Sequence, residues 1–222
     1  MTRGIAMTIM QARARPLREE IASAAIQGTA AAASAAGLVH LLARPGAALD
    51  ALGTAAVIVY GASMAFAFLA SALYHGIRHA RIKAAFRTLD HCTIFVFIAG
   101  VYTPVTLLPL RDHGGEFLLA AIWSLALVGI ALRLWNGPLY RRVAVPLYLA
   151  MGWLGFAWGV PLYETVGPIP ILLMFAGGFC YTGGLVFYGW PRLPFSNPAW
   201  HLCVVAGSVC FFLAVADFTR AP

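Results

Sequence analysis

The sequence predicts an all-α integral membrane protein, a bundle of seven transmembrane helices with its N-terminus in the cytoplasm. Of its 222 residues, 61% are hydrophobic and only 10% are charged. A soluble domain carries about 25% charged residues, most of them on its surface. These charges are too few to cover a water-facing surface of this size, so lipid must be the solvent for much of the chain. Long apolar runs and an uneven distribution of Lys and Arg agree with this.

The apolar runs define the individual spans. A bilayer core about 30 Å thick requires about 20 apolar residues at a rise of about 1.5 Å each. Seven runs meet this requirement: Ile21–Ala43, Leu52–Tyr74, His91–Leu110, Phe117–Trp135, Val143–Tyr163, Pro168–Trp190 and Ala199–Asp217. The first is rich in alanine and weakly hydrophobic. The fourth is short, and we expect Arg133 at its end to snorkel to the interface.

These spans divide the chain into a cytoplasmic N-terminal segment (residues 1–20), a transmembrane domain (21–217) and a short external tail (218–222). We expect no cleaved signal peptide, because the first apolar run is longer than a signal sequence requires. The four cysteines lie inside apolar runs without CxxC spacing, and we interpret them as small buried hydrophobic residues.

The basic residues determine the expected orientation. With the N-terminus inside, twelve of the 15 Lys and Arg residues fall on the cytoplasmic side and three outside. Cytoplasmic loops of membrane proteins carry such an excess. The net charge of +7 therefore reflects membrane topology, and we expect no nucleic-acid partner.

Polar residues gather at the predicted cytoplasmic ends of three spans. Ser71 and His75 lie four residues apart at the end of the second span, and therefore on one helix face. Asp90 opens the third span, and Asn197 and His201, again four apart, stand where the seventh begins. Ionisable groups at such depth are costly and are candidates for function.

Each of these residues also has a simpler interpretation. A histidine at a membrane edge can serve helix packing, and Asp90 can cap the third helix. His91 points about 100° away from Asp90 on a helix, so we expect it not to share that role. His79 lies in an Arg-rich loop and favours lipid headgroups, whereas His40 and His113 lie on the outer side. Together, however, the residues at one depth favour a site.

The chemistry available to such a set is metal-assisted hydrolysis. Two imidazoles and an oxygen ligand can hold zinc with one position open to water, and zinc lowers the pKa of that water to about 7. Asp90 could hold or deprotonate the water, and Ser71 could donate a hydrogen bond to the developing oxyanion.

At these residues the sequence resembles the hemolysin III family, bacterial relatives of the progestin and adipoQ (adiponectin) receptors and, more distantly, of alkaline ceramidases. The resemblance rests on Ser71-Ala-Leu-Tyr-His75, Leu89-Asp90-His91, Ile98-Ala-Gly-Val-Tyr-Thr-Pro104, Gly177-Gly-Phe-Cys-Tyr-Thr-Gly183, Phe187-Tyr188 and Trp200-His201, followed by Val204-Val-Ala-Gly-Ser208. It implies a seven-helix bundle in the bacterial inner membrane, with the N-terminus in the cytoplasm. It also implies a zinc held by three histidines near the cytoplasmic face, with the family's Ser-xxx-His on Ser71 and His75 and its aspartate on Asp90.

Asn197 departs from the family pattern. The first histidine of the family's C-terminal His-xxx-His falls on Asn197 and the second on His201. An amide oxygen is a weaker zinc ligand than imidazole, so three outcomes stay open: zinc bound weakly by His75, His201 and an oxygen, a harder metal, or no metal. Phe211 also stands where relatives often place a histidine.

The leading hypothesis is a zinc-dependent hydrolase of a lipid amide or ester, similar to ceramidases, with membrane lipids as its partners. The alternative is a non-enzymatic protein, such as a sensor, in membrane-lipid or membrane-energy homeostasis. A cytolytic pore or a transporter is disfavoured because no span carries a continuous polar stripe or polar residues at its middle.

Overall fold

The computed structural model describes residues 16–44 and 49–220, and every regular element in these ranges is a helix. The elements are α2 (Leu17–Ala43), α3 (Ala51–Gly76), α4 (Ala80–Leu107), α5 (Gly115–Trp135), α6 (Pro138–Trp153), the 3₁₀ helix η1 (Leu154–Trp158), α7 (Gly159–Val166), α8 (Pro168–Tyr188) and α9 (Ser196–Phe218). With α6, η1 and α7 counted as one span, seven helices of 21 to 29 residues in this part of the chain are long and apolar enough to cross a membrane. The predicted all-α, seven-helix class is confirmed.

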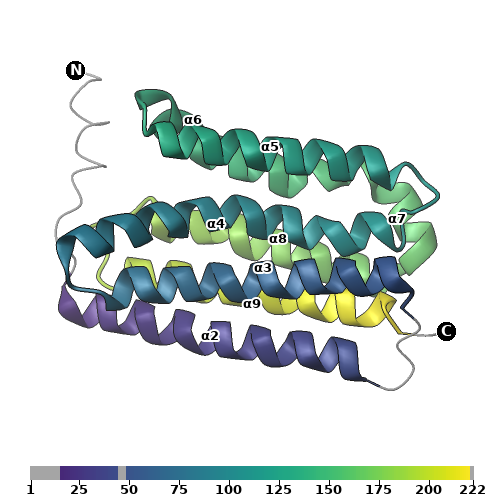
Figure 1. Cartoon of the computed structure of the whole chain (residues 1–222), viewed down its shortest axis with the longest axis horizontal. Helices are drawn as coiled ribbons and strands as arrows, with labels where there is room; N and C mark the ends of the chain where they lie inside the picture. The colour runs from purple at the N-terminus through teal and green to yellow at the C-terminus, as the bar shows by residue number, and fades with distance from the viewer. Residues whose placement is uncertain (1–15, 45–48, 221–222) are drawn as a thin grey trace.

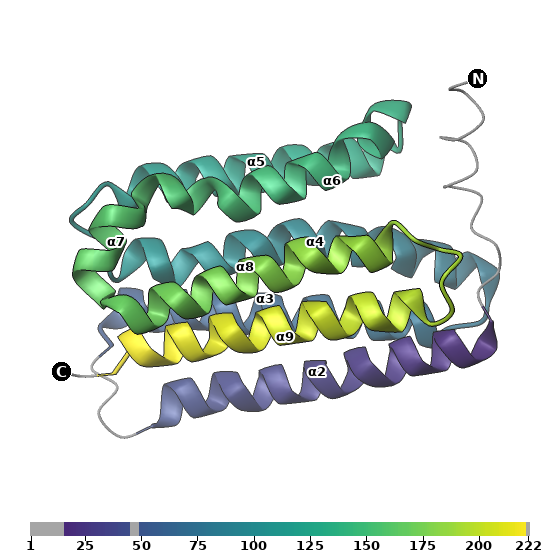
Figure 2. The ribbon, with the colours of Figure 1, turned by 180° about the vertical axis from the view of Figure 1, so that it is seen from behind.

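The helices run along one common axis (Figures 1 and 2). α2 forms one side and packs on α3 and α9, while α4 and α8 come next and α5 and α6 form the opposite side. α3 ends, and α4 and α9 begin, at the same end of this bundle, the end that the charge distribution assigns to the cytoplasm. His75, Asn197 and His201 therefore share one depth.

The apolar core lies on both sides of α4. On one side Phe95 belongs to a buried cluster with Leu118 and Ile122 of α5, and on the other Phe97 belongs to a second cluster with Val57 and Tyr60 of α3. The contact with α5 is very close, since a Cβ added at Gly129 would lie 2.3 Å from the Phe95 ring. α4 is therefore held rigidly between two packed layers.

The structure corrects the predicted start of the third span. α4 begins at Ala80, so Asp90 lies inside the helix, and His79, not Asp90, holds the N-cap position. The interpretation of Asp90 as a helix cap is wrong. The reason is physical: an apolar run measures the part of a helix that lies in lipid, whereas the helix itself continues through charged residues into water.

Arg133 also differs from expectation. We predicted that its side chain snorkels to the interface, but it is only 7% exposed. Its guanidinium donates to Thr88 Oγ1 and Asn136 Oδ1, each at 3.1 Å, and lies over the Tyr140 ring at 5.3 Å. The early start of α4 supplies Thr88 as a partner, so both terminal nitrogens of the guanidinium are hydrogen-bonded, while the buried Nε has no partner in the described part of the chain.

The fifth span is interrupted, which the sequence reading did not predict. The Tyr102 hydroxyl of α4 lies at the break, 2.9 Å from the Met151 carbonyl oxygen and 3.1 Å from that of Gly152, and it accepts from the Gly155 N–H at 2.9 Å. These contacts satisfy backbone groups that a 3₁₀ segment frees inside the membrane. The break bends α6 into α7.

The four cysteines are free and half-buried, not fully buried as predicted. Their helix faces turn partly outward.

Candidate functional site

Three side chains from two helices meet at the predicted cytoplasmic end of the bundle. His75 lies in the last turn of α3, and Asn197 and His201 lie in the first two turns of α9; each is 4–6% exposed. The two imidazole Nε2 atoms are 3.0 Å apart, and Asn197 Nδ2 lies 2.9 Å from that of His201 and 3.5 Å from that of His75. The spacing of four residues places Asn197 and His201 on one helix face, from which both reach His75.

α2 holds the outer side of these three residues. Glu20 Oε2 accepts from His75 Nδ1 at 3.2 Å and from the Lys83 ammonium at 2.7 Å. Ser23 Oγ lies 2.9 Å from Asn197 Nδ2, and the Gln27 amide nitrogen contacts His201 Nδ1. The ring nitrogens that face away from the centre therefore each have a polar partner, which orients the imidazoles.

Sequence reasoning missed the contribution of α2. Glu20 was assigned to the segment before the first span, whereas α2 begins at Leu17. A signal was present, because Glu20, Ser23, Gln27 and Ser34 recur at helical spacing and form a polar stripe in an otherwise apolar run. In the structure Ser23, Gln27 and Ser34 are at most 5% exposed.

One loop residue fixes the start of α9. Phe195 adopts a left-handed conformation with φ 57°, which is uncommon for a bulky side chain. Its N–H donates to Glu19 Oε1 at 3.1 Å. α2 therefore positions α9 directly before Asn197, as well as contacting its side chains.

The hydrogen bonds of His201 restrict its protonation. The amide nitrogens of Gln27 and Asn197 both point at this ring, yet a neutral imidazole has only one acceptor nitrogen. One of the two amides must therefore be turned about its terminal bond. If Gln27 turns, its oxygen, which otherwise has no hydrogen-bond partner, accepts from Nδ1–H of His201.

The two solutions differ in where the protons lie at the centre. His75 must donate its Nδ1–H to the Glu20 carboxylate, so its Nε2 carries a lone pair. With Gln27 turned, the lone pairs of both Nε2 atoms face each other across 3.0 Å, and the Asn197 amide donates to that of His201 at 2.9 Å and lies 3.5 Å from that of His75. With Asn197 turned instead, Gln27 donates to His201 Nδ1 and the Nε2–H of His201 donates to the Nε2 of His75. The hydrogen-bond chain is then complete without a metal.

Two histidines and one amide are the candidate metal ligands at this centre. Among residues 16–44 and 49–220, no three His, Cys, Asp or Glu side chains form a metal-binding cluster. The third candidate ligand is the Asn197 amide, and turning it presents Oδ1 to the centre. The three separations of 2.9, 3.0 and 3.5 Å bracket the value of about 3.3 Å between ligands of a tetrahedral zinc with bonds of about 2.0 Å.

Ser71 and Asp90 line the same cavity as the two histidines. Ser71 lies one helical turn before His75 and is 4% exposed, and no group in the described part of the chain hydrogen-bonds to its Oγ. Asp90 is half-buried on α4. The structure therefore brings all five candidate residues to one cavity.

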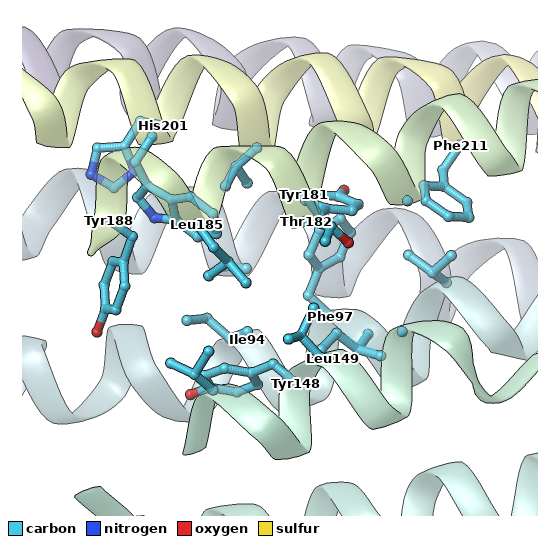
Figure 3. A pocket seen from close by; sticks show the side chains of 18 of the residues that line it. Ile94, Phe97, Tyr148, Leu149, Tyr181, Thr182, Leu185, Tyr188, His201 and Phe211 are labelled. Carbon is cyan, nitrogen blue, oxygen red and sulfur yellow. The ribbon is translucent and has the colours of Figure 1, made fainter. Parts of the chain in front are cut away.

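This cavity has a volume of about 2350 Å³ and extends between α3, α4, α6, α8 and α9. Figure 3 shows His201 at one end of a stretch of its lining and Phe211 at the other, with Ile94, Leu149 and Leu185 between them. Phe211 stacks on Tyr181 with ring centroids 5.9 Å apart. A polar end thus continues into an apolar interior.

The remaining histidines lie outside the polar centre. His91 faces α6, with its Nδ1 3.3 Å from the Tyr140 hydroxyl, which in turn lies 3.3 Å from the hydroxyl of Tyr148. His40, His79 and His113 are exposed and do not line the cavity.

Comparison with known proteins identifies the family of this chain. Residues 17–212 match the family described as Haemolysin-III related. The chain is 38% identical over 199 residues to Hemolysin-3 of Bacillus cereus, covering 90% of this chain and 91% of that protein. It is 37% identical over 202 residues to the Hemolysin-3 homolog of Bacillus subtilis (strain 168), covering 90% and 93%.

Proposed function

The chain belongs to the hemolysin III family of membrane proteins, and on that premise we propose that it is a zinc-dependent hydrolase of lipid amides or esters. Its site would lie at the cytoplasmic face of the bacterial inner membrane. The observation that carries the proposal is the meeting of His75, His201 and Asn197 at the polar end of a large apolar cavity.

His75 and His201 would hold the metal through Nε2, and Asn197 through Oδ1 after its amide turns. Zinc at such a site polarises a carbonyl and lowers the pKa of water to about 7. Glu20 keeps the proton of His75 on Nδ1, so Nε2 stays available. The turned Gln27 amide does the same for His201.

Ser71 and Asp90 have the chemistry for the remaining two roles. The Ser71 hydroxyl, buried at the cavity wall, can donate to the oxyanion that develops as a carbonyl is attacked. The Asp90 carboxylate can accept the proton of the attacking water and deliver it to the leaving group. The acyl chain of a lipid would occupy the apolar part of the cavity.

Lipid turnover by purified protein in liposomes tests this proposal. An N-acyl sphingoid base and an acylglycerol would be offered to the wild type, His75→Ala and His79→Ala. We expect His75→Ala to lose at least about 100-fold in rate, because a metal and its bound water are lost. His79 is exposed outside the cavity and serves as the matched control. Equal rates for all three proteins would refute a hydrolase at this site.

A non-enzymatic role is the second candidate, and the self-closing hydrogen-bond chain from Gln27 through His201 and His75 to Glu20 favours it. In that case His75→Ala and His201→Ala lower stability but leave function intact when folding is rescued. The purified wild type would then contain no metal and would hydrolyse no lipid.

The names of the two relatives refer to hemolysis, which raises a pore as a further candidate. The cavity interior of this chain is lined by residues such as Phe97, Leu149 and Leu185, which oppose ion conduction. Conductance of liposomes that contain the purified protein, abolished by Leu149→Trp, would favour the pore.

A further inference from the structure

Three arginines from three separate elements line the polar end of the cavity. Arg87 belongs to α4, Arg141 to the first turn of α6, and Arg192 to the segment between α8 and α9. None of them forms an ion pair with a carboxylate in the described part of the chain. Guanidinium groups bind phosphate and carboxylate through two parallel hydrogen bonds.

The carboxylates at this end do not cancel the three cations. Two acidic residues, Glu19 and Asp90, also line this end, against three guanidinium groups. The nearby Glu20 is paired with Lys83. The mouth of the cavity is therefore left with net positive charge.

Membrane topology alone does not explain this placement. Arg78, Arg81 and Arg142 lie at the same end of the bundle but do not line the cavity. They are exposed, as Arg141 and Arg192 are, whereas Arg87 is half-buried. Membrane orientation depends on how many cations lie on the cytoplasmic side, not on whether they border one cavity. Arg141 and Arg142 are adjacent in sequence, yet only the first borders the cavity.

The order of chemical groups along the cavity indicates what it would hold. Arg87 precedes Asp90 by three residues on α4, about 4.5 Å nearer the cytoplasm at about 1.5 Å per residue. Arg192 lies in the connection that precedes α9 and Asn197. Beyond the polar centre the lining is apolar, with Phe97 and Leu185. Cations, polar centre and apolar interior thus follow one another inward.

We propose that the cavity binds an acyl lipid with a phosphate headgroup, the phosphate held by Arg87, Arg141 and Arg192 and the acyl chain lying in the apolar interior. A volume of about 2350 Å³ exceeds the roughly 300–1,000 Å³ of common small-molecule pockets, as a chain-bearing ligand requires. The bond between headgroup and chain then lies at His75 and His201. The identification of this lipid as a substrate rests on the proposed function, whereas its binding does not.

Equilibrium binding to the purified full chain in an uncharged detergent tests the proposal, with the fluorescence of the cavity residues Trp190 and Trp200 as the signal. The probes are hexadecyl phosphate, hexadecanoate, hexadecanol and inorganic phosphate. The variants are Arg87→Gln/Arg141→Gln/Arg192→Gln and its control Arg78→Gln/Arg81→Gln/Arg142→Gln, which removes the same charge. We expect hexadecyl phosphate to bind tightest and the cavity triple variant to weaken it by at least about tenfold. The control should stay within about twofold.

Several results would overturn the proposal. Equal losses in both triple variants would mean that only bulk charge matters. Inorganic phosphate competing as well as hexadecyl phosphate would assign the site to a free anion, and equal binding of hexadecanoate would exclude selection for phosphate. If the cavity triple variant does not fold, the single variant Arg141→Gln and the wild type's salt dependence decide instead. Binding of hexadecyl phosphate, but not of hexadecanol, should weaken from about 0.05 M to about 0.5 M NaCl.

This experiment separates the two proposals. Arginine-dependent binding without turnover of any lipid supports the binding site and refutes the hydrolase. Lipid turnover without arginine-dependent binding supports the hydrolase and refutes the phosphate-binding site.

Discussion

Glu20→Gln should reveal whether α2 organises a metal site. Glu20 Oε2 bridges His75 Nδ1 at 3.2 Å and Lys83 Nζ at 2.7 Å, and the two side chains of the ion pair with Lys83 are 13% and 29% exposed. Replacing the carboxylate removes one charged hydrogen bond from each partner. Lys83 keeps the Tyr74 carbonyl oxygen at 2.9 Å, so we expect a loss of only about 1–2 kcal/mol in unfolding free energy.

The larger expected effect of Glu20→Gln concerns metal affinity. A partner that orients a ligating histidine typically contributes about 10- to 100-fold to metal binding. We therefore expect the zinc dissociation constant, measured by competition with a chromophoric chelator, to rise by that factor. Lys83→Met removes the cation but leaves the contact between Glu20 and His75, so it should lower stability with a smaller effect on zinc.

Glu19→Gln is the matched control for this experiment. Glu19 is adjacent in sequence and accepts from the Phe195 N–H, which an amide oxygen can also do. Zinc affinity that is unchanged in Glu20→Gln, or lowered equally in Glu19→Gln, would refute the assignment of Glu20 as the residue that positions His75.

Two further predictions concern the scaffold that holds the site. Gly129→Ala places a Cβ 2.3 Å from the Phe95 ring, and we expect overpacking to cost about 1–3 kcal/mol in unfolding free energy, measured by thermal unfolding. The control is Gly183→Ala, whose added Cβ has nothing within 4 Å and should be neutral in the same assay. Arg44 donates to the Ala216 carbonyl oxygen at 2.6 Å in the last turn of α9, so Arg44→Ala should cost about 1–2 kcal/mol and expose α9 amides to hydrogen exchange. An unchanged melting temperature in Gly129→Ala, or unchanged exchange in Arg44→Ala, would contradict these packing assignments.

The sequence predicted the class of fold because lipid imposes a strict rule. Apolar runs must be helices when no water can satisfy the backbone, so hydropathy located all seven spans. Hydropathy could not locate the ends of helices that continue into water. This is why the start of α4 at Ala80 was missed and why Asp90 was interpreted as a cap.

The candidate site was likewise predicted only in part. Topology and spacing brought Ser71, His75, Asp90, Asn197 and His201 to one depth, and the structure places all five on one cavity. The contacts of Glu20, Ser23 and Gln27 were not anticipated, because which helix packs on α3 and α9 is decided by three-dimensional contacts rather than by composition. The polar stripe on α2 was the available signal.

The buried position of Arg133 and the break in the fifth span have a common explanation. Each depends on a single partner from α4, Thr88 in one case and Tyr102 in the other. Neither contact leaves a local pattern in the sequence.

The metal content of the purified protein tests the central claim most directly. Wild type, His201→Ala and Asn197→His would be purified in parallel without chelator and analysed for zinc by mass spectrometry. We predict about one zinc ion per chain in the wild type, its loss in His201→Ala and tighter retention in Asn197→His during dialysis. A wild type without zinc, beside an Asn197→His variant that acquires it, would contradict the account and show that Asn197 closes the hydrogen-bond chain in place of a metal.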